Sequence, residues 1–89
     1  MLDDIFFAAE IDSHIARIDL HTEDNILSAL EQLEQKLFLL FNKEERYVRI
    51  IYGIGSGRLR ISVHEALSKN PLVKSWKESE GGGSCIILF

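Results

Sequence analysis

The sequence predicts an α/β domain with the order β-α-β-α-β-β, built as a sandwich around a mixed four-stranded sheet. A β-branched apolar run, Val48, Ile50 and Ile51, precedes three alternating glycines and a helical pattern. Residues 25–42 carry a longer helical pattern, and two further strand-like runs, Val73–Glu78 and Ser84–Phe89, flank Gly81-Gly82-Gly83 as in a hairpin. Strand–helix–strand order implies parallel pairing and the hairpin adds antiparallel pairing, so we expect two or three layers.

The composition is that of one folded domain. The chain has 89 residues, 46% of them apolar and 27% charged. Its charge is uneven: residues 1–45 hold eleven acids and three bases, a net of −8, and residues 46–89 hold three acids and seven bases, a net of +4. This asymmetry fits either a polyanion that meets the second half or charges spread over an ordinary folded surface.

The single cysteine excludes a disulfide framework and a cysteine zinc site. Cys85 lies in an apolar run and is expected to be a small buried core residue. The sequence has no run of about 18 apolar residues, and its acidic N-terminus is unlike a signal peptide. We therefore expect a cytoplasmic protein that does not bind membranes.

Residues 1–14 are expected to form an N-terminal extension ahead of a domain at 15–89. The extension contains the apolar cluster Ile5, Phe6 and Phe7. This cluster can dock on the core, mediate self-association with a second copy, or be a remnant of a longer parent protein.

The segment from Ile15 to His21 is predicted to be a strand. Alternation places Ala16, Ile18 and Leu20 on one face, and the opposite face carries Arg17, Asp19 and His21. Because a buried strand does not turn three polar groups toward a core, we expect the Asp19/His21 end to lie at the rim of the sheet.

A long helix is predicted from about Asn25 to Asn42, with Thr22 or Asp24 as its N-cap. Its apolar stripe has the spacing i, i+4, i+7, i+11, i+15 and comprises Ile26, Leu30, Leu33, Leu37 and Phe41. Further apolar residues widen the stripe near the end of the helix, which we expect to be well buried; they are Phe38, Leu39 and Leu40.

A charged loop leads to a second strand, Tyr47–Tyr52, parallel to the first. The second helix is expected from about Arg58 to Lys69. It should end at Asn70, in the left-handed conformation that asparagine tolerates, because Pro71 cannot continue a helix.

The glycines Gly53, Gly55 and Gly57 connect this strand to the second helix. A strand, a glycine loop and a helix together point free backbone N–H groups at an anion. The loop is not a dinucleotide fingerprint, since position 58 is arginine, nor a Walker loop, since no Gly-Lys-Ser/Thr follows. We expect a phosphate here, with a purely structural turn as the alternative; the flanking cations are Arg46, Arg49, Arg58 and Arg60.

Asp19 and His21 form a second candidate site, at a strand end beside the start of the long helix. The positive end of that helix favours a neutral imidazole, which can accept a proton. The alternative is structural: Asp19 satisfies backbone donors and His21 packs at the corner. Arg60 and His64, four residues apart, either extend a basic face or line a solvated one.

With both motifs placed, residues 18–89 resemble the Smr (small MutS-related) domain, which occurs alone or at the C-terminus of MutS2 proteins. Ile18-Asp19-Leu20-His21-Thr22 is similar to the Leu-Asp-Leu-His-Gly of the family, and Tyr52-Gly-Ile-Gly-Ser-Gly57 to its His-Gly-x-Gly-x-Gly. Asn70-Pro71, the glycine-rich turn and the last apolar strand also match.

The resemblance implies a fold like the C-terminal domain of bacterial translation initiation factor three. It also implies nucleic-acid binding, with nicking of DNA or cleavage of RNA in recombination control, repair or ribosome rescue. By the pattern of the family, Asp19 and His21 would be catalytic; the phosphate-binding set would be Tyr52, Gly53, Gly55, Ser56, Gly57, Arg58 and Arg60. No cofactor is expected with certainty, and Mg²⁺ is the one candidate.

Two positions depart from the pattern of the family. Thr22 replaces a glycine before the long helix, and Tyr52 replaces the histidine before the glycine loop, where a phenol is a poor base near pH 7. Both changes bear on catalysis rather than on binding. A binding-only adaptor, which recognises nucleic acid or a ribosomal or MutS-type protein, is therefore the alternative function.

Overall fold

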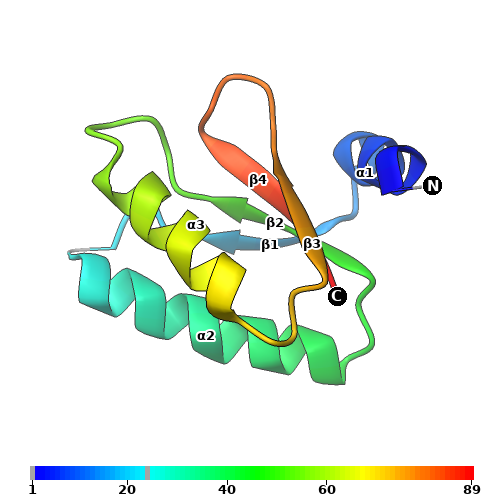
Figure 1. Ribbon diagram of the computed structural model, residues 1–89, viewed down its shortest axis with the longest axis horizontal. Helices are drawn as coiled ribbons and strands as arrows, with labels where there is room; N and C mark the ends of the chain where they lie inside the picture. Colours follow the sequence, from blue (N-terminus) through cyan, green and yellow to red (C-terminus); the bar gives the residue numbers. More distant parts are fainter. Residues whose placement is uncertain (1, 24) are drawn as a thin grey trace.

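The computed structural model describes residues 2–23 and 25–89, and in these the elements follow the order α1-β1-α2-β2-α3-β3-β4 (Figure 1). The predicted β-α-β-α-β-β order is confirmed, with one helix added in front. The elements are α1 (Leu2–Ile11), β1 (Ala16–Asp19), α2 (Ile26–Asn42), β2 (Tyr47–Ile51), α3 (Arg58–Lys69), β3 (Ser75–Glu78) and β4 (Ser84–Leu88).

The four strands form one mixed sheet in the order β1-β2-β4-β3. β1 and β2 are parallel, with Asp19 opposite Ile51, while β4 is antiparallel to both β2 and β3. The expected parallel crossover and the expected hairpin are therefore both present. The crossover matters for the site, because it brings the carboxyl ends of β1 and β2 to the same edge of the sheet.

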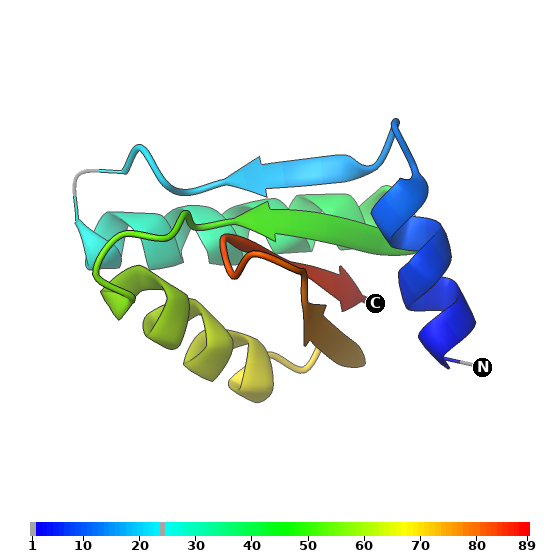
Figure 2. The ribbon, with the colours of Figure 1, turned by 90° about the horizontal axis from the view of Figure 1, so that it is seen from above.

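β4 is buried on both faces, and its side chains divide the molecule into layers. Cys85 and Ile87 pack with α2 and α3, whereas Ile86 and Leu88 pack with α1. Since successive strand residues point to opposite faces, α1 covers one face of the sheet and the two longer helices cover the other. The ribbon viewed from above shows α1 beside the N-terminal ends of β1 and β2 (Figure 2). The fold thus has three layers.

The larger core cluster lies between the sheet and the two longer helices. α2 contributes Ala29, Leu33 and Leu37, and α3 contributes Val63 and Leu67. Each fully buried side chain of this size stabilises the fold by roughly 1.5–3 kcal/mol relative to an exposed one. Both helices are therefore held against the sheet that carries the two candidate motifs.

The first residues of the chain dock on the core. Phe6 and Ala9 of α1 are buried against Ile86 and Leu88, and the Tyr47 hydroxyl donates to Asp12 Oδ2 at 2.9 Å. Of the apolar cluster considered for self-association, Phe6 is thus a core residue, Ile5 is half-buried, and Phe7 remains 67% exposed.

The N-cap of α2 is Asn25, whose side-chain oxygen accepts from the Ser28 N–H at 2.8 Å. The expectation of Thr22 as the cap is wrong, and Asp24 lies outside the described residues. Asparagine is as good an N-cap as aspartate, so sequence preference alone could not choose among three adjacent candidates.

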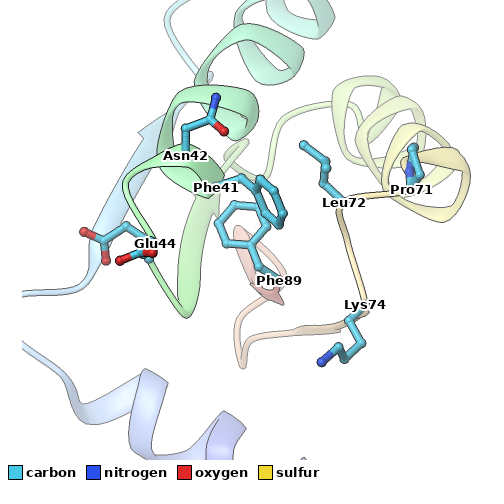
Figure 3. A pocket seen from close by; sticks show the side chains of 8 residues that line it. Phe41, Asn42, Glu44, Pro71, Leu72, Lys74 and Phe89 are labelled. Carbon is cyan, nitrogen blue, oxygen red and sulfur yellow. The ribbon is translucent and has the colours of Figure 1, made fainter.

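The C-terminal end of α2 is only partly buried, whereas the sequence predicted that it would be well buried. Phe38, Leu39 and Phe41 are 59%, 57% and 42% exposed. Leu37 is fully buried and Leu40 packs against the core cluster, so this end of the helix rests on the core while Phe38 and Leu39 stand on its outer side. Phe41 meets Phe89 edge to face at 5.6 Å, beside an open hollow of about 750 Å³ (Figure 3).

α3 has the predicted bounds, but its end differs. Asn70 has φ −82° and ψ 119°, which is extended rather than left-handed. A residue that precedes proline is pushed toward extended backbone by contact with the proline ring. The Asn70 side chain instead accepts from the Leu72 N–H at 2.8 Å, which turns the chain toward β3.

Candidate functional site

The first half of the site lies where β1 ends at the edge of the sheet. Asp19 is its last residue, and the next residue, Leu20, still donates to the Ile51 carbonyl at 2.8 Å. Ile18 and Leu20 are fully buried, while Asp19 and His21 are 48% and 51% exposed on the opposite side. The predicted alternation and the predicted position at the rim are confirmed.

Asp19 and His21 are hydrogen-bonded to each other. His21 Nδ1 contacts Asp19 Oδ1, and the same oxygen accepts from the His21 backbone N–H at 3.2 Å. The hydrogen bond from His21 lowers the pKa of Asp19 below its ordinary value. An ionised carboxylate only accepts, so Nδ1 carries a proton, and whenever the ring carries that proton alone Nε2 is an acceptor. The pair thus holds an imidazole in the tautomer that a general base requires.

The second half of the site, the glycine loop of residues 53–57, begins directly beside His21. A Cβ added to Gly53 would lie 3.3 Å from the His21 Cβ. This contact continues the parallel register, in which Asp19 lies opposite Ile51 and His21 therefore lies opposite Gly53. Residues that are 32 positions apart in the sequence are neighbours because both follow the carboxyl end of a parallel strand.

The glycine loop requires its glycines: Gly53, Gly55 and Gly57 all have positive φ, at 77°, 36° and 85°. Its entry is fixed, since the N–H groups of Tyr52 and Gly53 both donate to the Gly83 carbonyl in the β3–β4 turn, at 3.1 and 2.9 Å. The hydrogen bonds recorded for the described residues use neither the N–H of Gly55 nor that of Gly57.

The first turn of α3 is also open to a ligand. Gly57 is its N-cap, and no side chain accepts from the helix in the usual capping manner. The nearest side-chain contact is a long one, from the Arg58 N–H to Ser56 Oγ at 3.4 Å. An uncapped helix start next to free loop amides is a place where an anion completes the hydrogen bonding.

The four arginines predicted to flank the loop do not act together. Arg46 precedes β2, one strand length of about 17 Å from the loop, and Arg49 pairs with Glu10 at 2.7 Å on the α1 side. Arg60 pairs with Glu78 at 2.8 Å, which offsets the positive charge on the face that it shares with His64. Arg58 is exposed, and within residues 2–23 and 25–89 it has no ion pair. It is the cation that the loop presents.

Tyr52 points away from the anion side of the loop. It is buried, and its hydroxyl lies 2.9 Å from His64 Nε2 and 3.2 Å from Glu78 Oε2. His64 also packs on Trp76, with ring centroids 4.4 Å apart. This network was missed in the sequence because its members come from β2, α3 and β3. Tyr52 therefore joins the loop to the core, and the expectation that it contacts phosphate has no support in this geometry.

The half-buried imidazole of His64 predicts a loss of stability in mild acid. Burial lowers its pKa below the ordinary 6.5, although Glu78 faces it, and Arg60 acts in the same direction as burial. The unfolded chain then binds more protons, so the free energy of unfolding falls as the pH drops below about 6.5. Thermal unfolding at pH 7.5 and 5.5 should show a smaller drop in Tm for His64→Gln than for the wild type. His14→Gln, at an exposed histidine, is the control and should show the same drop in Tm as the wild type. A drop in Tm for His64→Gln equal to that of the wild type would contradict the assignment.

Three further expectations from the sequence concern Cys85, a metal site and the membrane. Burial raises the pKa of the Cys85 thiol to about 12, so it is a protonated core group. In the described part of the chain, no three His, Cys, Asp or Glu side chains converge as a metal site. Within the same residues, none of the helices combines the length and apolarity needed to cross a bilayer.

The sequence of the chain is similar to a part of several known proteins. The chain is 34% identical over 68 residues to the endonuclease MutS2 of Aquifex aeolicus and 34% identical over 73 residues to that of Thermomicrobium roseum. These alignments cover 73% and 79% of the chain but 9% of each relative, so the chain spans about a tenth of their length.

The fold is also that of a solved structure. The crystal structure of the Smr domain of Thermus thermophilus MutS2 superposes with a TM-score of 0.77 at 24% identity, covering 83% of this chain and 96% of that one. The model of the Smr domain family matches residues 18–89, which include both halves of the site. The chain therefore belongs to the Smr domain family.

Proposed function

We propose that this domain binds nucleic acid through the glycine loop and Arg58 and cleaves a phosphodiester with Asp19 and His21, as a nicking endonuclease on DNA or RNA. The observation that carries the proposal is the placement of the oriented imidazole of His21 against Gly53, where the anion-binding loop begins. The MutS2 relatives are named endonucleases, which supports the same reaction class.

Binding begins with the phosphate. The N–H groups of Gly55 and Gly57 and the open start of α3 donate to the phosphate oxygens, and Arg58 adds a full positive charge. None of these groups reads a base edge, so affinity depends weakly on sequence and strongly on salt.

Cleavage then needs one proton acceptor and one charge stabiliser. His21 Nε2 takes a proton from a water molecule as its oxygen forms the new bond to phosphorus. The bond from phosphorus to the leaving sugar oxygen breaks, and that oxygen takes up a proton from a solvent water molecule. Asp19 keeps Nδ1 protonated and stabilises the imidazolium that forms. The loop amides and Arg58 offset the charge that builds on the phosphate oxygens.

Alanine variants of Arg58 and Arg60, the two arginines nearest the loop, should differ in their binding affinity and in its salt dependence. Arg58→Ala should weaken binding of a short DNA or RNA probe about three- to tenfold at low salt and reduce the slope of log K against log salt by roughly one. Arg60→Ala should change the slope little, because its charge is already paired with Glu78. Fluorescence anisotropy at several salt concentrations measures both quantities, with the exposed and distant Arg46→Ala as the control. Equal slopes for Arg58→Ala and wild type would place the phosphate elsewhere.

A binding-only adaptor is the second candidate. It is favoured by the outer face of α1, where Phe7 and Ile11 are each 67% exposed and lie one helical turn apart. Such a surface can bind a protein partner or a second copy. The adaptor function is tested with point variants of Phe7 and Ile11. Deleting α1 would not serve, because it would also remove Phe6 and Ala9 from the core.

A further inference from the structure

A groove lies beside the glycine loop, between the N-terminal ends of α2 and α3. Its volume is about 500 Å³, within the range of small-molecule sites. Both ribbon views place the start of α2 and the loop before α3 at the same end of the molecule (Figures 1 and 2). Ser56 and Arg58 line the groove and also belong to the phosphate-binding region, so the two are continuous.

The lining of the groove combines apolar and polar side chains. Leu27 and Leu59 contribute aliphatic side chains, and Leu27 is 75% exposed, although it stands in the first turns of a helix whose core stripe is formed by other residues. Glu23 and Asn25 contribute polar groups. The Asn25 side-chain oxygen is occupied by the Ser28 N–H, which leaves its NH₂ group as a donor.

The charges of the groove indicate which part of a nucleotide it takes. A phosphate inside it would meet the carboxylate of Glu23, whereas Arg58 and the loop amides offer a better anion site next to it. The neutral base has apolar faces for Leu27 and Leu59 and polar edges for Glu23 and Asn25. In a duplex the faces of a base are covered by its stacked neighbours, and only an unpaired base presents them.

We propose that this groove binds the base of an unpaired nucleotide whose phosphate lies on the glycine loop. This inference rests on the proposed function, because it takes the phosphate position from it. It makes Leu27 a specificity-determining residue that distinguishes unpaired or distorted nucleic acid from an intact duplex.

The test uses three matched probes: a duplex with one unpaired thymine, the same duplex with an abasic sugar at that position, and the fully paired duplex. Fluorescence anisotropy should show that the wild-type domain binds the thymine probe about 5- to 20-fold more tightly than the abasic one. Leu27→Ala should reduce this ratio to about twofold or less and leave the affinity for the abasic probe unchanged. Leu27→Phe should keep or raise the ratio, since an aromatic ring stacks on a base.

Leu39→Ala is the matched control, because Leu39 is an exposed leucine of the same helix at its far end. Its thymine-to-abasic ratio should equal that of the wild type. A wild type that binds both probes equally would overturn the groove proposal and leave phosphate binding standing. A wild type that binds none of the three probes would overturn the proposed function as well.

Discussion

Replacing His21 by alanine is expected to reduce phosphodiester cleavage by about 10²–10⁴-fold, the usual contribution of a proton-transfer group. Binding should change little, because the phosphate is held by loop amides and Arg58 rather than by the imidazole. Nicking of a supercoiled plasmid measures the first quantity, and a shift assay with the same preparation measures the second. A panel of duplex, branched and single-stranded DNA and RNA identifies the best substrate beforehand.

His14→Ala is the control for this variant. His14 is also exposed and precedes β1, at the opposite end of the strand from His21. Its loss should leave cleavage unchanged. Nicking at the wild-type rate by His21→Ala would exclude the proposed base. An inert wild type that still binds the probe would make the domain a binder, with Thr22 and Tyr52 marking lost chemistry.

Gly53→Ala should give the second-largest effect, a decrease of about 10- to 100-fold in cleavage. Its φ of 77° is strained for alanine, by roughly 1–2 kcal/mol. In addition, the new Cβ would lie 3.3 Å from the His21 Cβ, so the imidazole has to move relative to the bound phosphate. Cleavage rate and Tm are measured together on the same variant.

Alanine variants of two other glycines distinguish the effect of backbone strain from that of displacing His21. Gly57 and Gly81 have φ of 85° and 91°, and an added Cβ at either has nothing within 4 Å. Gly81→Ala should therefore lose similar stability without losing cleavage, and Gly57→Ala should weaken binding through the loop. If Gly81→Ala lost as much cleavage as Gly53→Ala, general destabilisation would explain both and the contact with His21 would be irrelevant.

The sequence was most informative where local chemistry sets the structure. The alternation around Ile18 and Leu20 placed Asp19 and His21 on the exposed side, and the three alternating glycines located the loop between β2 and α3. The bounds of α3 followed from Gly57 before it and Pro71 after it.

The errors came from tertiary structure. The exposure of Phe38 and Leu39 depended on which side of α2 meets the sheet, which the apolar run at the end of the helix does not reveal. Arg60 and Tyr52 are near the loop in sequence, and the structure shows that both also contact Glu78 of β3. An acidic residue 18 positions after Arg60 gave no local indication of that pairing. The docking of α1 likewise depended on the second apolar face of β4.

The position of β4 has a consequence for how the domain reaches its native state. This strand is the last element in the order of the chain, yet it lies between β2 and β3 in the middle of the sheet. It pairs with β2 across 33 to 41 positions, from Ile51 with Ser84 to Tyr47 with Leu88. Such non-local pairing makes folding slow relative to a helical bundle of equal size. Because the N–H groups of Tyr52 and Gly53 donate to the Gly83 carbonyl just before β4, we expect the glycine loop of the candidate site to reach its final position only after β4 has been made.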